Sequence, residues 1–305
     1  MGGWHFAGFF RRPGGCFVDP TAVHYSEFMP GPFNEFMSEP QAPDPSGVIR
    51  EVRGLAELAR LLFRFPELAR QPRGNGQPVI ILPGYGAGDG STAILKIYLR
   101  LLGYRARGWG LGRNTGNVPH LLPPILKRVA SLARRSGQKV NLIGWSLGGY
   151  LARELARERG DLIGRIITLG TPVVGGPKYT IVARTFRRRG IDVEAMAAEI
   201  ELRNRVVLST PVVAIYSRAD AVVAWQACID HNTANVEHVE VRTTHLGFGF
   251  SPDVYKIIAQ RLAPDHVPIQ VVEPSESPAV AELQLEPSVV VLNAAPDYST
   301  IQKKS

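Results

Sequence analysis

Residues 140–158 read VNLIGWSLGGYLARELARE and carry the strongest structural signal in the chain. An apolar run at 140–144 is typical of a buried strand, and the segment at 147–158 is typical of a helix. Between them lies Gly144-Trp145-Ser146-Leu147-Gly148, the pattern Gly-x-Ser-x-Gly. A serine on so sharp a turn leaves no room for side chains two residues to either side, which explains the glycines. The turn predicts an exposed, nucleophilic Ser146; an ordinary tight strand-to-helix turn is the alternative.

Apolar runs and segments of helical periodicity alternate on both sides of this turn. Strands are predicted at 78–82, 104–109, 163–169, 212–217 and, at a sheet edge, 236–241, and helices at 91–102, 121–135, 193–205 and 251–263. This alternation from 78 to 263 predicts the α/β class, a mostly parallel sheet flanked by helices on both faces. Ligands of such sheets bind outside the carboxyl ends of the strands, where Ser146 is expected to lie.

The segments before and after this alternating region are of another kind. We expect residues 1–46 to be an irregular arm, 47–77 an N-terminal amphipathic helix and linker, 78–263 the α/β domain, and 264–305 a disordered tail. The helix is predicted from apolar residues at helical spacing, namely Ile49, Val52, Leu55, Leu58, Leu62 and Phe65. Packing on the domain is the main interpretation of these residues, and membrane-surface docking is the alternative.

The composition is that of a globular protein, with 45% hydrophobic and 20% charged residues among 305. No apolar run reaches the roughly 18 residues of a membrane-spanning helix, and residues 1–16 lack the order of a secretory signal, so we expect a cytoplasmic protein. A net charge of +8 suggests at most weak association with anionic membrane surfaces. No nucleic-acid-binding motif accompanies it. Cys16 and Cys228 have no metal-ligand spacing, and Cys228 is interpreted as a buried small hydrophobe.

A serine nucleophile requires a base and a group that orients the base. His245 follows the strand that ends in VEVRTT and precedes the last helix, which makes it the best candidate for the base; His231 is the rival. Asp220 ends the apolar stretch PVVAIYSRAD at the same edge of the sheet, and Asp230 is the runner-up. The chain order Ser146, Asp220, His245 is the order expected where the serine stands on such a strand-to-helix turn of an α/β sheet.

The oxyanion that forms during acyl transfer requires two backbone N–H donors. One is expected from Leu147, directly after the nucleophile. The other is expected from the glycine-rich loop after the first strand, where we choose Tyr85, with Gly86 as its neighbour. A plain turn or a phosphate-binding loop are the other interpretations, but no Gly-Lys-Ser/Thr follows.

Five segments together resemble the bacterial lipase- and esterase-like serine hydrolases of the α/β-hydrolase superfamily. These are LPGYGAGDGST (82–92), LGYRARGWGLGRNTG (102–116), GWSLGG (144–149), IYSRADAVV (215–223) and THLGF (244–248). The resemblance covers about 78–263 and implies the same Ser146, Asp220 and His245 triad. Pro83 stands where the family often has histidine, and Ala221 where glycine is frequent. Arg113 and Asn114 also match the family, and we expect them to brace a loop near the site.

The resemblance further implies a cap over the active site, formed by an insertion at about 173–209. Its residues Ile181, Val182, Phe186 and Met196 are candidates to line an acyl pocket or to pack the cap itself.

The expected function is hydrolysis of small-molecule or lipid carboxylic esters through an acyl-enzyme, with no metal and no organic cofactor. An acyltransferase or thioesterase with the same triad is the first alternative, and a non-catalytic binding protein with this fold is the second. A haloalkane dehalogenase reaction is disfavoured, because an enzyme of that type would carry an aspartate at the nucleophile position, which here is Ser146.

Overall fold

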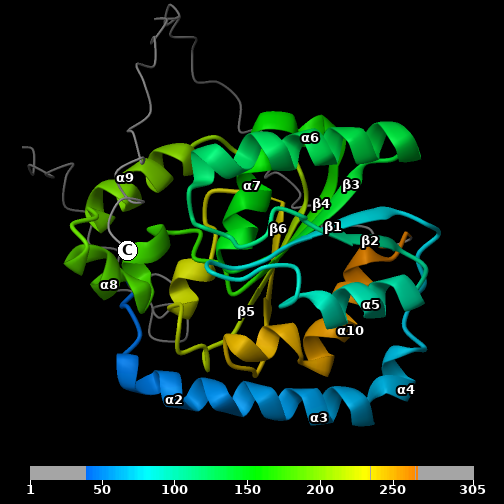
Figure 1. Ribbon diagram of the computed structural model, residues 1–305, viewed down its shortest axis with the longest axis horizontal. Coiled ribbons are helices and arrows are strands. Elements are labelled where there is room, and N and C mark those ends of the chain that lie inside the picture. Colours follow the sequence, from blue (N-terminus) through cyan, green and yellow to red (C-terminus); the bar gives the residue numbers. More distant parts are fainter. Residues whose placement is uncertain (1–38, 234, 265, 267–305) are drawn as a thin grey trace, which may run out of the picture. The chain divides into compact units, whose positions relative to one another are not determined.

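The computed structural model describes residues 39–264 and 266, except residue 234. Most of the predicted N-terminal arm and nearly all of the predicted C-terminal tail lie outside these residues. Within them, strands and helices alternate along the chain as predicted (Figure 1).

Six strands form one sheet in which every neighbouring pair is parallel. They are β1 (Pro78–Leu82), β2 (Arg105–Gly108), β3 (Val140–Trp145), β4 (Ile163–Leu169), β5 (Val212–Tyr216) and β6 (Val236–Glu240). The order across the sheet is β2-β1-β3-β4-β5-β6, so β6 is an edge strand, as predicted. The order reverses between β1 and β3, and in doubly wound sheets the crevice at such a reversal is where ligands bind.

Helices cover both faces of the sheet, and each face has its own apolar core. On one face lie α5 (Ala93–Leu101) and α10 (Pro252–Leu262), and on the other α6 (Val118–Ser136) and α7 (Leu147–Arg159) (Figure 1). Strand residues alternate between the two cores: Val79 and Ile81 belong to the first, Ile80 and Leu82 to the second. The expected α/β fold, a parallel sheet flanked by helices, is confirmed.

The insertion predicted at 173–209 contains a 3-10 turn, η5 (Gly176–Tyr179), and two helices, α8 (Val182–Arg188) and α9 (Val193–Asn204). Asp192 caps α9 by accepting a hydrogen bond from the N–H of Ala195 at 2.9 Å. Helix α6 begins three residues before its predicted start. The side chain of Asn117 caps it by accepting from the N–H of His120, and Pro119 is compatible with the first turn.

The N-terminal helical segment (residues 45–68) is not the single helix that periodicity predicts. It consists of η2 (Pro45–Gly47), α2 (Val48–Glu51), η3 (Val52–Leu55), α3 (Ala56–Phe63) and α4 (Phe65–Leu68). Tight 3-10 geometry at Val52–Leu55 changes the direction in which later side chains point. Figure 1 shows α3 running along the outside of α10, with α2 beyond the end of α10.

The side of this segment that packs against the domain also differs from the expectation. Leu61 and Leu68 join the core beneath, and Glu51 and Glu57 are buried beside them. The predicted apolar stripe instead points to solvent: Ile49, Val52 and Leu62 are 79%, 63% and 70% exposed. The periodicity therefore predicts a helix correctly but indicates the wrong buried face, because polar contacts together with Leu61 and Leu68 attach the other face.

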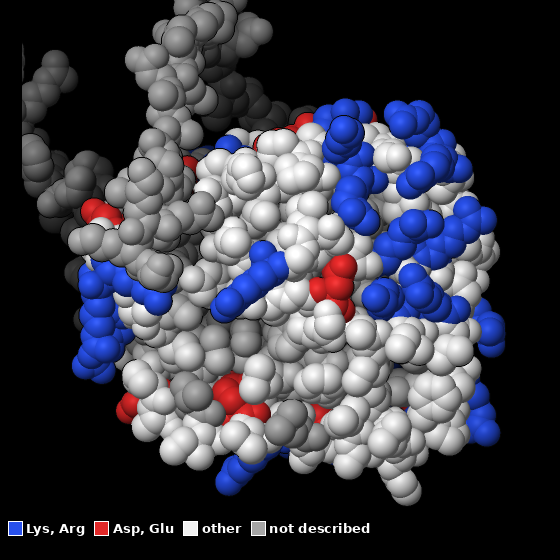
Figure 2. Space-filling model, in the orientation of Figure 1, with Lys and Arg blue, Asp and Glu red and all other residues white. Residues whose placement is uncertain are grey.

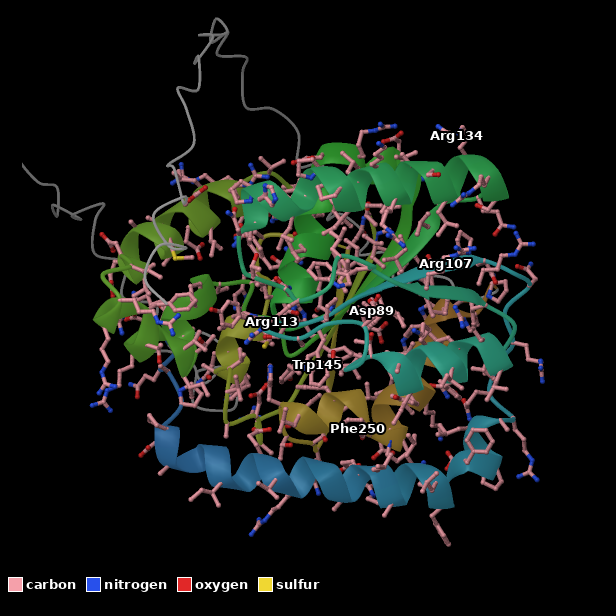
Figure 3. All side chains as sticks on the ribbon, in the orientation of Figure 1. Asp89, Arg107, Arg113, Arg134, Trp145 and Phe250 are labelled. Carbon is pink, nitrogen blue, oxygen red and sulfur yellow. The ribbon has the colours of Figure 1, made fainter. Side chains whose placement is uncertain are left out.

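Basic side chains gather around β2 and the C-terminal end of α6 (Figure 2). Figure 3 places Arg107 and Arg134 on this side of the molecule, away from α8. Arg107, Lys127, Arg128 and Arg135 line a shallow groove of about 380 Å³ there.

Cys228 is buried, as predicted. No helix of the described residues is long and apolar enough to span a bilayer.

Candidate active site

Ser146 stands on a strained turn between β3 and α7. Its φ of 52° and ψ of −121° make it the one non-glycine residue with positive φ in the described part of the chain. A Cβ on Gly148 would lie 2.1 Å from the carbonyl oxygen of Leu82, and one on Gly144 would lie 2.3 Å from that of Gly148. The two glycines are therefore required by close backbone packing. Strain of this kind is concentrated at functional sites, and here it presents the serine side chain above the sheet.

The turn lies at the reversal point of the sheet, next to the loop that follows β1. Gly84 in that loop is so close to the Ser146 turn that a Cβ on Gly84 would lie 3.4 Å from Cβ of Ser146. The N–H of Ser146 donates to the carbonyl of Leu169 at the end of β4, at 2.8 Å. The carboxyl ends of three neighbouring strands thus fix the position of Ser146.

His245 and Asp220 come together at the same edge of the sheet. Nδ1 of His245 lies 2.7 Å from Oδ2 of Asp220, and both side chains are buried. The other oxygen, Oδ1, accepts hydrogen bonds from the N–H groups of Val222 and Val223, each at 2.8 Å. Burial lowers the pKa of His245, but the negative charge of Asp220, its hydrogen bond to the imidazole and the charge of Glu51 together outweigh burial and raise this pKa above its usual 6.5.

The rival residues occupy other places. Asp230 forms a buried ion pair with Arg153, and its Oδ1 accepts from the N–H of Asn232. Its own N–H donates to Nε2 of His238 at 2.9 Å. His231 is exposed. The contacts of Asp230 are thus those of a residue that holds a loop together, and they involve neither Ser146 nor His245.

Ser146 and His245 line one cavity of about 400 Å³. Most of the remaining wall is apolar, and much of it comes from the insertion: Val182, Phe186, Met196 and Ile200. Three of the four insertion residues predicted for this role are in the wall, while Ile181 is absent from it and Ile200 was missed. Ile200 was missed because no local pattern distinguishes a cavity-facing side of α9.

Leu147 and Tyr85 also line this cavity. Leu147 is the first residue of α7, so its N–H has no acceptor within the helix. Tyr85 lies in the loop after β1, and its ring contacts that of Phe186 edge-on, with centroids 5.8 Å apart. Both residues that the sequence proposes as oxyanion donors therefore line the same cavity as Ser146.

The loop that holds Tyr85 is braced by the two residues expected to do so. Nδ2 of Asn114, fully buried, donates to the carbonyl of Pro83 at 2.9 Å. Its backbone carbonyl accepts from the N–H of Gly86 at 2.8 Å. Nε of Arg113 donates to the carbonyl of Gly86 at 3.0 Å. These bonds confirm the expected bracing role.

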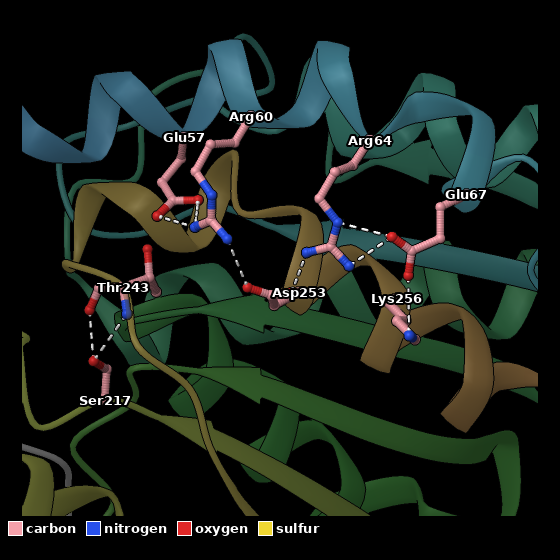
Figure 4. A network of polar contacts seen from close by, with 8 residues as sticks. All are labelled: Glu57, Arg60, Arg64, Glu67, Ser217, Thr243, Asp253 and Lys256. Carbon is pink, nitrogen blue, oxygen red and sulfur yellow. Dashed lines mark hydrogen bonds and ion pairs between the residues drawn. The ribbon is translucent and has the colours of Figure 1, made fainter.

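Two further contacts near the site have no sequence signal. Ser217, at the end of β5, donates its hydroxyl to the carbonyl of Thr243 and accepts from its N–H at 3.3 Å (Figure 4). Glu51, from the N-terminal helical segment, contacts the loops of both Asp220 and His245. Both were missed because their partners are far away in sequence. Among the described residues, no group of three His, Cys, Asp or Glu side chains could hold a metal ion.

The strand order, the parallel pairing and the Ser146 turn are together those of the α/β-hydrolase fold. No protein-family model matches it. Two curated sequences that it resembles are pimeloyl-(acyl-carrier protein) methyl ester esterases from two strains of Vibrio vulnificus. Each is 26% identical over 140 residues, which are 44% of this chain and 50% of the relative. The chain spans about half the length of these curated relatives.

Solved structures with related folds include a monoacylglycerol lipase from Paleococcus ferrophilus, 17% identical with a TM-score of 0.45, covering 62% of this chain and 96% of that one. They also include one chain described under the metagenome-derived lipolytic enzymes LipS and LipT; it is 14% identical with a TM-score of 0.49, and the match covers 63% of this chain and 93% of that one. A third is the mouse alpha/beta hydrolase domain-containing protein 10, 16% identical with a TM-score of 0.45, covering 62% and 89%.

Proposed function

We propose that this protein hydrolyses carboxylic esters through an acyl-enzyme, with Ser146 as nucleophile, His245 as base and Asp220 as the group that orients His245. The observation that carries the proposal is the 2.7 Å contact between His245 and Asp220 beside a cavity shared with Ser146. A second support is the likeness to curated esterases over about half of their length.

The reaction follows from these roles. Nε2 of His245 accepts the proton of the Ser146 hydroxyl while Oγ attacks the ester carbonyl carbon. The tetrahedral intermediate expels the alcohol, which takes the proton from His245 as the C–O bond breaks. Water then enters, gives a proton to His245 and attacks the acyl carbon. Collapse releases the carboxylic acid and returns the proton to Ser146.

The N–H groups of Leu147 and Tyr85 would hold the oxyanion of both intermediates. Loss of one such donor typically costs about 2.7–4 kcal/mol of transition-state stabilisation. The bonds from Asn114 and Arg113 support this role by fixing the loop around Tyr85. Asp220 stabilises the imidazolium form of His245 as it appears during each half of the reaction.

The apolar cavity indicates an acyl group with substantial hydrocarbon content. Phe186, Met196 and Ile200 from the insertion contribute to its wall, so we infer that the insertion is a cap that selects the acyl chain. Ile200→Trp should fill part of the cavity and move the preference among p-nitrophenyl esters toward shorter acyl chains. Leu202→Trp, on the same helix but exposed, is the matched control and should leave the preference unchanged.

The direct test of the proposed function is hydrolysis of p-nitrophenyl esters of increasing chain length by wild type and Ser146→Ala. We expect the variant to lose at least about 10³-fold in kcat while keeping its fold. A variant that keeps full activity would show that Ser146 is not the nucleophile.

Adding an alcohol to the assay distinguishes a hydrolase from the alternative, an acyltransferase. A transferase would pass the acyl group to the alcohol in preference to water.

We also propose weak association of the N-terminal helical segment with anionic membrane surfaces. Its outward side exposes Ile49, Leu62 and Phe63, the last by 87%, with Arg53 exposed on the same segment and Arg70 exposed just after it. Two of its acidic residues, Glu51 and Glu57, are buried toward the domain and leave the outward side basic. Apolar side chains flanked by arginines are typical of interfacial helices.

This association is measured by co-sedimentation with vesicles of anionic or zwitterionic lipid. We expect binding to anionic vesicles, lost at high salt and in a Leu62→Glu/Phe63→Glu variant. Equal recovery of wild type and variant from the supernatant would contradict the proposal.

A further inference from the structure

We propose that Glu51 is a positioning residue of the active site: its carboxylate joins the loop of Asp220 to the loop of His245 and holds the pair in register. This inference deepens the proposed function and rests on it. Glu51 lies 27 residues before β1, in a segment that the family resemblance at 78–263 does not include.

The two oxygens of Glu51 bind one loop each. Oε1 accepts a hydrogen bond from the N–H of Ala221 at 2.9 Å, and Oε2 accepts one from the N–H of Leu246 at 2.8 Å. Ala221 directly follows Asp220, and Leu246 directly follows His245. One side chain therefore fixes the backbone next to both members of the pair, and only 2% of it is exposed.

Close backbone packing at Gly54 supports the same arrangement independently. A Cβ at Gly54 would lie 2.6 Å from Oγ1 of Thr244 and 2.7 Å from the backbone nitrogen of Gly247. The segment thus approaches the His245 loop more closely than any other residue type would permit. Such a close approach is what allows a glutamate side chain to reach both loops.

Ion pairs at the other end of the segment hold it in place (Figure 4). Arg60 and Arg64 both pair with Asp253 at the start of α10, and Glu67 pairs with Lys256 at 3.0 Å. Figure 4 shows these side chains bridging the segment and α10, which directly follows the His245 loop. The segment and the loop are therefore attached to the same helix.

Glu51 also acts on His245 through its charge. In the described structure, the charged groups that act on the imidazole are Asp220, from the β5 loop, and Glu51, from α2. The rings of Trp145 and Phe248, also beside His245, carry no charge. Removal of the Glu51 charge should therefore lower the pKa of His245. Glu51 is not part of the cavity wall, so its loss should affect kcat and not KM.

The test compares wild type with Glu51→Gln and with Glu57→Gln, a control in the same segment whose carboxylate pairs with Arg60. The pKa of His245 is measured by NMR titration of the imidazole on the full chain, and kcat and KM are measured against pH with one p-nitrophenyl ester. For Glu51→Gln we expect a lower His245 pKa, an acidic limb of kcat/KM moved to lower pH, at least about a tenfold loss of kcat and an unchanged KM. Glu57→Gln should match wild type.

An unchanged His245 pKa and unchanged kcat in Glu51→Gln would overturn the proposal. If Glu51→Gln does not fold, Glu51→Asp replaces it, because it keeps the charge and retracts the oxygens. Lower kcat with a wild-type acidic limb would then support the positioning role, and wild-type kcat would overturn it. The NMR titration needs no turnover, so a wild type without esterase activity would refute the proposed function while Glu51 remained testable.

Discussion

Oδ2 of Asp220 lies 2.7 Å from Nδ1 of His245, while Oδ1 of the same carboxylate is occupied by two backbone N–H groups. Because an ionised carboxylate can only accept hydrogen bonds, the contact favours the tautomer in which Nδ1 of His245 carries the proton. Nε2 is then left free to accept a proton on the side of the cavity, as a general base must.

Asp220→Asn should therefore lower kcat by about 10⁴-fold with little change of fold. The amide nitrogen of asparagine can donate to Nδ1, which would place the proton of the imidazole on Nε2, the wrong atom for a base. Steady-state kinetics with an activated ester measures the loss. Activity within tenfold of wild type would show that another residue orients His245.

Asp230→Asn is the matched control, and its defect should be one of stability. Asp230 and Arg153 form a buried ion pair, so the substitution leaves a buried guanidinium without its carboxylate. Breaking such a pair typically costs about 3–5 kcal/mol of unfolding free energy. Urea denaturation should show this loss, whereas kcat of the folded enzyme should remain near wild type. A large loss of kcat without loss of stability would instead favour Asp230 as the group that orients His245.

The pH dependence should report the raised pKa of His245. The base must be neutral, so kcat/KM should rise with pH through a pKa above 6.5. Stability should change in the opposite direction, because the folded state holds this proton more tightly than the unfolded state. The stabilisation is fully present below pH 6.5 and is lost as pH rises through the folded-state pKa. A kcat/KM limb below pH 6.5 would contradict the charge arrangement around His245.

Asn114→Ala should lower kcat by roughly 10–100-fold by loosening the loop of Tyr85. It also leaves the carbonyl of Pro83 and the N–H of Gly116 without their partner, at about 1–3 kcal/mol of stability. Asn117→Ala is the control: it removes only the cap of α6 and should reduce stability without reducing kcat. Equal kcat in the two variants would contradict the bracing role of Asn114.

Gly148→Ala should destabilise the protein, because the new Cβ would lie 2.1 Å from the carbonyl oxygen of Leu82. Overpacking typically lowers the free energy of unfolding by about 1–3 kcal/mol. Because the neighbour here is rigid backbone, we expect the loss for Gly148→Ala to lie at the upper end of this range or beyond it. A Cβ at Gly90 meets no atom within 4 Å, so Gly90→Ala should be nearly neutral. Thermal unfolding of both variants checks the contrast, and equal melting temperatures would contradict the packing account of the turn.

The strands and the Ser146 turn could be predicted because their signals are local. Strands β1 and β4 begin and end at the predicted residues, since short apolar runs bounded by polar or turn residues leave little choice. Glycines at 144 and 148 indicate the turn, because they leave the space that so sharp a turn requires. Asp220 and His245 could be proposed because each follows a recognisable strand, and parallel strands bring their carboxyl ends to one edge.

The features that escaped prediction depend on distant partners. Glu51 binds N–H groups 170 and 195 residues away, and nothing in its neighbourhood distinguishes it from a solvated helical glutamate. The buried side of α3 was misjudged for a related reason: Arg60 and Arg64 are attached to Asp253, so ion pairs as well as apolar burial determine its orientation. Ile200 lies in the cavity wall because of how the insertion packs on the domain, and helical periodicity within α9 does not predict that packing.

The most direct measurement of the central claim is labelling by an activated fluorophosphonate, followed by mass spectrometry of the peptides. The account predicts one label on wild type, located on Ser146, no label on Ser146→Ala, and much slower labelling of His245→Ala. A folded wild type that stays unlabelled, or a label on another serine, would contradict the assignment of Ser146 as the nucleophile.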